Sequence, residues 1–221
     1  MISLKTERKL LQVKQLTKSY RKQFIFDQVT FDLAQGEWLG LVGENGSGKS
    51  TLVKIIAGLE KADQGEVLFN KRDQTTFSRG EWAQSVQLIT QYTRRALDPT
   101  KTIAKILAEP LHQWKILPEH LIPNRLEQMM DEYNLPLEML AKYPLELSGG
   151  QYQRVCIALS LLAEPQVLIC DEITASLDKI NEKRIFNLLK QRTNLSVIMI
   201  AHDTSLIERL CDRRLKISDY K

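Results

Sequence analysis

A lysine and a serine end a glycine-rich segment near the start of the chain, in a spacing that suits phosphate binding. The segment "GENGSGKST" covers residues 43–51 and matches G-x-x-x-x-G-K-[ST]. Its glycines let successive backbone N–H groups point toward a β-phosphate, and the positive end of the following helix adds to the attraction. Lys49 can reach the β- and γ-phosphates, while the hydroxyl of Ser50 can bind Mg²⁺. We therefore expect nucleotide contacts from Gly43, Glu44, Asn45, Gly46, Ser47, Gly48, Lys49, Ser50 and Thr51.

Two acidic residues end the apolar run "VLICDE" in the last third of the chain. Asp171 and Glu172 fall at the C-terminal end of a predicted buried strand, where open α/β sheets bind their ligands. Asp171 suits water-mediated Mg²⁺ binding, and Glu172 can point past the metal toward an attacking water. Neighbouring carboxylates can also be mere surface charge. A P-loop in the same chain favours the hydrolytic interpretation, because phosphoryl transfer needs both a metal anchor and a water-positioning group.

The stretch "ELSGGQYQR", residues 146–154, predicts a helix start with an unusual composition. Ser148 is a good N-cap, and Gln151 lies three residues later, as a capping box requires. Gly149 and Gly150 each cost roughly 0.5–1 kcal/mol relative to Ala in a helix. They leave bare backbone N–H groups at a positive helix end, to which Ser148 adds a hydroxyl donor. Either an anion or a closely packed neighbouring helix would explain the pair.

The elements that must position these residues follow from hydrophobic periodicity. Apolar and polar residues alternate over residues 29–33, and the runs "WLGLV", "QVLIC" and "SVIMI" are typical of buried strands. Further strands are expected at residues 65–70 and 85–90, and helical segments at 50–59, 102–111, 122–135, 148–165, 181–192 and 204–210. Buried strands separated by helices predict a parallel sheet covered on both faces. We expect an α/β fold with an antiparallel, strand-rich N-terminal part and a helical insertion near residues 92–163.

Taken in order, these motifs resemble the ATP-binding subunits of ABC transporters over nearly the whole chain. Residues 43–51 match that family's Walker A loop, "LSGGQ" at 147–151 its signature, "VLICDE" its Walker B segment and "SLD" at 176–178 its D-loop. Tyr20 falls where the family places an adenine-stacking aromatic, Gln91 where its Q-loop glutamine follows a strand, and His202 at its switch histidine. A P-loop is common to many NTPases, whereas "LSGGQ" shortly before a Walker B strand is far more specific.

The resemblance implies one nucleotide-binding domain over residues 1–221. Its P-loop NTPase core, of RecA-like type and carrying an antiparallel β subdomain, would comprise residues 1–91 and 164–221. The helical signature subdomain would comprise residues 92–163. The implied ligands are ATP and Mg²⁺, with the metal near Ser50, Gln91 and Asp171.

The resemblance also assigns roles at the site. Glu172 would be the general base, and His202 would contact the γ-phosphate and orient the water. Gln91 would touch Mg²⁺ or the water and report nucleotide state to a membrane partner. Two such domains face each other in the family, so that Ser148, Gly149, Gly150 and Gln151 of one close over the γ-phosphate bound by the other. Asp178 would shape that dimer interface, and Lys49 would serve both binding and catalysis.

One segment resembles a particular branch of the family, the ATPases of peptide and nickel importers. After Gln91, that branch has an Asn/Asp-Pro, a helix and a Glu-Pro-Leu, here Asp98-Pro99, residues 102–108 and 109–111. This region should contact integral membrane permease subunits; alternatively, Pro110 merely ends a helix. Departures from the branch at Tyr92, Leu159 and Ile173 suggest a divergent subunit without removing a catalytic group. The second ATPase subunit can be a copy of this chain or a different one.

Bulk composition limits the remaining possibilities. The formal charge of +4 is not gathered in a basic stripe, so we expect no nucleic-acid partner. Cys156, Cys170 and Cys211 lie apart in apolar segments and suit reduced core thiols. Neither a signal-peptide core nor a long apolar run is visible, so we expect a cytoplasmic protein. The resemblance to importer ATPases implies that it is peripheral to the cytoplasmic face of the cell membrane and is served indirectly by an extracytoplasmic solute-binding protein. The alternatives are an ABC ATPase of another transporter branch, a non-transport ABC ATPase and a binding-only regulatory subunit.

Overall fold

A computed structural model describes residues 8–21, 23–90, 96–174, 177–201 and 203–220. The chain forms two compact units. The first contains residues 1–88, 166–171 and 194–221, and the second contains residues 89–165 and 172–193. The helical insertion expected at residues 92–163 lies within the second unit, which also takes in residues 172–193.

An antiparallel sheet forms one part of the first unit. Its strands, in spatial order, are β2 (Gln23–Ala34), β1 (Lys9–Tyr20), β4 (Gln64–Phe69) and β5 (Arg72–Asp73). Register shifts interrupt the pairing of β1 with β2, and Gln15 and Gln28 have positive φ values of 51°. Such bulges break the two-residue alternation that marks a strand in the sequence. This explains why periodicity indicated only residues 29–33 of these two long strands.

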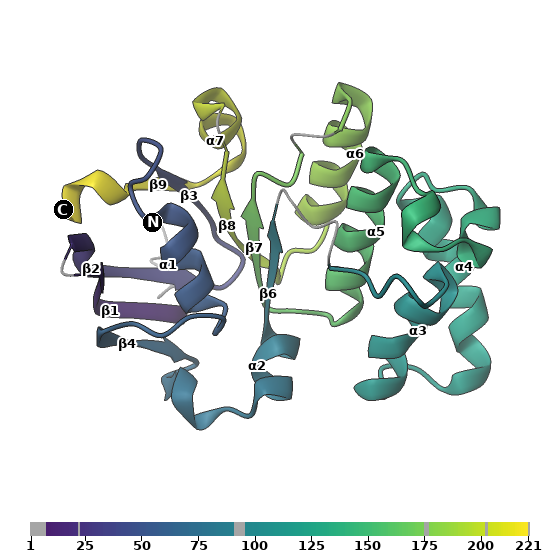
Figure 1. The fold of residues 1–221 in the computed structure, drawn as a ribbon, viewed down its shortest axis with the longest axis horizontal. Helices are drawn as coiled ribbons and strands as arrows, with labels where there is room; N and C mark the ends of the chain where they lie inside the picture. Colours follow the sequence, from purple (N-terminus) through teal and green to yellow (C-terminus); the bar gives the residue numbers. More distant parts are fainter. Residues whose placement is uncertain (1–7, 22, 91–95, 175–176, 202, 221) are drawn as a thin grey trace, which may run out of the picture. The chain divides into compact units, whose positions relative to one another are not determined.

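A second, five-stranded sheet contains the buried apolar runs (Figure 1). Its order is β6 (Val86–Thr90), β7 (Val167–Asp171), β8 (Ser196–Ile200), β3 (Trp38–Val42) and β9 (Arg213–Lys216). The pairings of β8 with β7 and with β3, and of β3 with β9, are parallel. All five residues of β8 are buried, as a strand covered on both faces requires. The predicted α/β fold is confirmed.

Helix α1 (Lys49–Ile56) joins the two sheets through one hydrophobic core. Its apolar residues Leu52, Val53, Ile55 and Ile56 pack with residues from both sheets. The first unit also contains α2 (Arg79–Ser85), α7 (Thr204–Leu210), and the 3-10 turns η1 (Gln74–Thr76) and η5 (Ile217–Tyr220). Helix α2 was not predicted, although Ser78 and Glu81 form a full capping box at its start. Its seven residues are too few to show helical periodicity.

The second unit consists mainly of helices (Figure 1). They are α3 (Ile103–Gln113), α4 (Ile122–Glu132), α5 (Gly149–Leu162) and α6 (Lys179–Lys190), with the 3-10 turns η2 (Glu119–Leu121), η3 (Leu137–Ala141) and η4 (Pro144–Glu146). The guanidinium of Arg184 on α6 donates to the backbone oxygens of Asp131 and Glu132 at the end of α4. Helix α3 continues through Pro110 to Gln113, so the proline does not end it. Across the described parts of the chain, every helix is too short or too polar to cross a bilayer.

Candidate nucleotide-binding site

The P-loop connects the C-terminal end of β3 to the start of α1. Three of its glycines have positive φ: 156° at Gly43, 77° at Gly46 and 95° at Gly48. Gly48 is the N-cap of α1 and has no side chain that could accept a hydrogen bond from the first turn of the helix. The first backbone N–H groups of α1 are therefore left for an anion, at the positive end of the helix.

Close packing also explains why glycine is needed in this loop. A Cβ atom on Gly43 would lie 2.7 Å from Ser47 Oγ, and one on Gly48 would lie 2.7 Å from Ile25 Cγ2. Ser47 is only 1% exposed, and its hydroxyl has no hydrogen-bond partner among the described residues. A buried hydroxyl without a partner costs free energy unless a ligand supplies one. The loop therefore has the donor pattern of a phosphate site.

The ammonium group of Lys49 forms hydrogen bonds with the backbone of the same loop. It donates to the backbone oxygen of Gly43 at 2.7 Å and to that of Glu44 at 2.9 Å. An ammonium group has three N–H donors, so these two bonds leave one to offer to a phosphate oxygen. The loop and its lysine thus place a positive charge where phosphate oxygens would lie.

Asp171 lies at the same end of the parallel sheet as the P-loop. Ile200 of β8 is the register partner of Leu41 in β3 on one side and of Asp171 in β7 on the other. Strands lie about 4.8 Å apart, so the end of β3 and Asp171, on either side of β8, are about 10 Å apart. Hydroxyl and carboxylate oxygens from Ser50 and Asp171 are the ligand type that Mg²⁺ prefers. The residues present therefore fit that metal.

Glu172 has an unusual backbone conformation directly after Asp171. Its φ is 56°, in the left-handed region that non-glycine residues rarely adopt. Such conformations cost on the order of 1 kcal/mol or more and concentrate at functional sites. Two residues earlier, within β7, burial raises the pKa of the Cys170 thiol well above its usual range, which keeps that core thiol protonated. Glu172 is thus held in a specific, strained orientation after a rigid strand.

Tyr20 lies at the end of β1, beside the P-loop helix. The residue is 45% exposed, and its hydroxyl interacts with the side chain of Thr51 in the first turn of α1. The hydroxyl also donates to Glu60, and this hydrogen bond is the main cause that raises the tyrosine pKa above its ordinary value. An exposed aromatic face next to a P-loop can stack on a base.

The signature segment starts α5 as the sequence predicts. Ser148 is the N-cap; its Oγ accepts from the backbone N–H of Gln151 at 3.3 Å, and the Gln151 side chain accepts from Ser148 N at 3.0 Å. The predicted capping box is confirmed. A Cβ added to Gly149 would meet nothing within 4 Å. Among the described residues, therefore, no packed neighbour requires a glycine at this position.

Asp178 has a structural role at the start of α6. One carboxylate oxygen accepts from Asn181 N at 2.8 Å and the other from Asn181 Nδ2 at 2.6 Å. The backbone hydrogen bond from Asn181 is the largest cause that lowers the pKa of this carboxyl, and the side-chain bond comes next. Three predicted positions, Gln91, His202 and Ser176 of the D-loop, lie outside the described residues, as does Tyr92.

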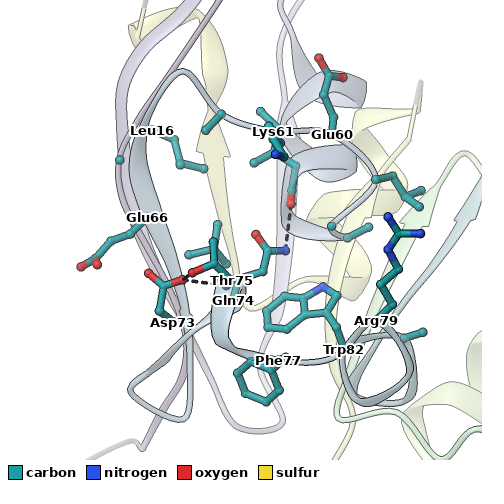
Figure 2. Close-up of a pocket in the computed structure, with 18 of the residues that line it drawn as sticks. Leu16, Glu60, Lys61, Glu66, Asp73, Gln74, Thr75, Phe77, Arg79 and Trp82 are labelled. Carbon is teal, nitrogen blue, oxygen red and sulfur yellow. Dashed lines mark hydrogen bonds between the residues drawn. The ribbon is translucent and has the colours of Figure 1, made fainter.

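A cavity in the first unit lies at the opposite end of α1 from the P-loop. Its volume is about 760 Å³, and Figure 2 shows Trp82 and Phe77 along its floor. Trp82 Nε1 donates to Ile56 O at 3.2 Å, and Gln74 Nε2 donates to Ile55 O and Ile56 O at 3.1 and 3.0 Å. Side chains that line the cavity thus donate hydrogen bonds to the last carbonyls of the P-loop helix. Sequence reasoning did not find this support, because no motif marks it.

The first unit has the fold and the phosphate-binding loop of a P-loop NTPase. The signature sequence at the start of α5 indicates one particular family within that class. A sequence profile of the ABC transporter family matches residues 26–175. The chain therefore belongs to the ABC transporter family, as the motifs predicted.

Individual relatives agree with this assignment. The nickel import ATP-binding protein NikE of Rhodospirillum rubrum is 34% identical, over 96% of this chain and 82% of its own length. The oligopeptide transport ATP-binding protein OppF of Salmonella typhimurium is 39% identical over 86% of this chain, which spans only 59% of OppF. A solved ATP-binding subunit of an ABC transporter, 27% identical, superposes with a TM-score of 0.83 over 95% of this chain and 87% of that structure.

Proposed function

We propose that this chain hydrolyses ATP on the cytoplasmic face of the cell membrane to drive import of an oligopeptide or of nickel, free or chelated. The observation that carries the proposal is the P-loop, whose glycine conformations, lysine bonds and buried serine form a phosphate site in a chain of the ABC transporter family. NikE and OppF, relatives at 34% and 39% identity, support the two kinds of cargo. Cargo would pass through integral membrane permease subunits, fed by an extracytoplasmic solute-binding protein.

Each site residue has a definite part in this mechanism. The P-loop amides and Lys49 would hold the phosphates in place, and Tyr20 would stack on adenine. Ser50, Asp171 and Gln91 would hold Mg²⁺, which when bound neutralises charge that develops on the phosphates. Glu172 would accept a proton from the attacking water, and His202 would orient that water. Positioning and electrostatic stabilisation supply most of the catalysis in such reactions.

A second ATPase subunit would complete the site. Gly149 has only open space around it among the described residues, so its lack of a side chain serves no packing within this chain. The facing subunit would bring its own bound nucleotide to Ser148, Gly149, Gly150 and Gln151, with Asp178 near the same interface. Backbone N–H groups at the start of α5 would then approach the terminal phosphate.

The steady-state ATPase activity of Glu172→Gln tests the assignment of the base. Loss of a general base should lower the turnover number on the order of 10²–10⁴-fold. Glu164→Gln is the matched control, because Glu164 is also a glutamate with positive φ, at 50°, and is exposed. We expect the control to hydrolyse ATP like the wild type. Turnover near the wild-type rate in Glu172→Gln would remove this residue from the mechanism.

A further inference from the structure

A cluster of charged side chains surrounds Tyr20 at the end of β1. The hydroxyl of Tyr20 donates to the carboxylate of Glu60, in the loop that follows α1. Lys18 Nζ lies 3.5 Å from Glu60 Oε1 and 5.1 Å from the centre of the Tyr20 ring. The Lys18 and Glu60 side chains are only 12% and 22% exposed, so the ion pair is shielded from water more than an ordinary surface pair.

Asp63 fixes the other side of this cluster. It forms an ion pair with Lys18 at 3.2 Å and accepts from Ser19 N at 2.7 Å and from Ser19 Oγ at 2.9 Å. Lys18 also donates to the backbone oxygen of Lys61 at 2.8 Å. The hydrogen bond from Ser19 N is the largest cause that lowers the pKa of the Asp63 carboxyl. The strand end that carries Tyr20 is thus tied to residues 60–63, which follow the P-loop helix directly.

We propose that Glu60 is a positioning residue that fixes the Tyr20 ring for stacking on the nucleotide base, with Lys18 and Asp63 holding Glu60 in place. The inference rests on the proposed role of Tyr20 at adenine. A tyrosine that is 45% exposed would otherwise sample several rotamers, and fixing its ring beforehand lowers the entropy cost of binding. Figure 2 shows the Glu60 carboxylate directed away from Phe77 and Trp82, so this group is not part of the cavity floor.

The same contacts connect the base to the phosphates. Tyr20 interacts with Thr51 in the first turn of α1, and Glu60 lies just beyond the last turn. The Tyr20 ring that would stack on the base therefore has contacts near both ends of the helix that begins at the P-loop. A change at Glu60 should weaken recognition of the base and leave recognition of the phosphates intact.

Nucleotide affinity in four variants tests the proposal. Tyr20→Phe and Glu60→Ala each remove one side of the same hydrogen bond, so each should raise the Kd for ATP about 3- to 10-fold. The double variant should be no weaker than either single variant, since both remove the same interaction. Glu60→Gln keeps an oxygen acceptor for the Tyr20 hydroxyl and should retain most of the wild-type affinity for ATP. Binding of inorganic tripolyphosphate should stay unchanged in all four.

Two controls separate this inference from the proposed function. Glu66→Ala removes a more exposed ion pair, between β4 and Lys14 of β1 at 3.0 Å, and should bind ATP like the wild type. Tyr20→Ala removes the ring itself; unchanged ATP affinity there would refute the adenine role of Tyr20. If Tyr20→Ala binds ATP weakly while Tyr20→Phe and Glu60→Ala bind it normally, the adenine role stands and the positioning role of Glu60 is refuted. Equal losses for ATP and tripolyphosphate in Glu60→Ala would also refute it.

Discussion

Gly48 is the residue of the P-loop whose environment is most restrictive. It combines a φ of 95° with a position where a Cβ would lie 2.7 Å from Ile25 and 2.9 Å from Phe26. We predict that Gly48→Ala lowers the free energy of unfolding by about 1–3 kcal/mol, because backbone strain and overpacking act together. Urea denaturation of the purified protein would measure the loss.

Gly46 provides the matched control for that prediction. Its φ of 77° is also left-handed, but a Cβ there would meet nothing within 4 Å. Gly46→Ala should therefore cost only the strain, about 1 kcal/mol. Equal destabilisation by the two substitutions would show that the contacts with β2 do not restrict Gly48.

The residues of the site differ in how far the sequence alone could reveal them. The P-loop is contiguous, and its chemistry depends on a fixed spacing, so residues 43–51 could be predicted together. Glu60 could not, because its partner Tyr20 lies 40 positions away and no periodic pattern links the two. Only the fold brings the end of β1 next to the loop after α1.

Elements with continuous apolar runs were predicted well, and interrupted or short ones were not. β3 and β8 match "WLGLV" and "SVIMI" residue for residue, because both strands are buried on two faces. Helix α7 likewise matches "TSLIERL". β1 was not delimited because bulges break its alternation, and β9, with the sequence "RRLK", is too short and polar to show a pattern.

The C-terminal end of α1 depends on a support that involves more than one element. Gln74 donates two hydrogen bonds to the last carbonyls of the helix, and Trp82 donates a third. We predict that Gln74→Ala lowers the free energy of unfolding by about 1–2 kcal/mol, because it leaves half-satisfied carbonyls at the core. The midpoint of urea unfolding, at an unchanged m-value, would report this loss.

Gln12→Ala is a suitable comparison for Gln74→Ala. The Gln12 amide donates a single bond to Asp32 at 3.1 Å, and Asp32 keeps an ion pair with Lys9. That variant should lose clearly less stability, within about 0.5–1 kcal/mol of the wild type. If both variants unfold at the same urea concentration, the hydrogen bonds from Gln74 to α1 contribute no more to stability than the single bond of Gln12.

At the scale of the whole molecule, a substitution in the signature helix α5 should lower activity without lowering stability. Gly149 and Gly80 both lie in the first turn of a helix, α5 and α2, and a Cβ on either would meet nothing within 4 Å. Within one chain, therefore, both positions should accept alanine equally well. They differ in the proposed assembly, where only Gly149 faces the nucleotide of a second subunit.

We predict that Gly149→Ala and Gly80→Ala leave the free energy of unfolding unchanged or raise it by up to about 1 kcal/mol, because alanine has a higher helix propensity than glycine. Gly149→Ala should nevertheless lower ATP turnover on the order of 10²-fold, because a methyl group displaces the facing phosphate by about 1 Å. Gly80→Ala should leave turnover unchanged. Thermal unfolding and steady-state ATPase assays on the same preparations would check both effects. Normal turnover in Gly149→Ala would mean that no second subunit closes against this glycine, and the shared site would have to be abandoned.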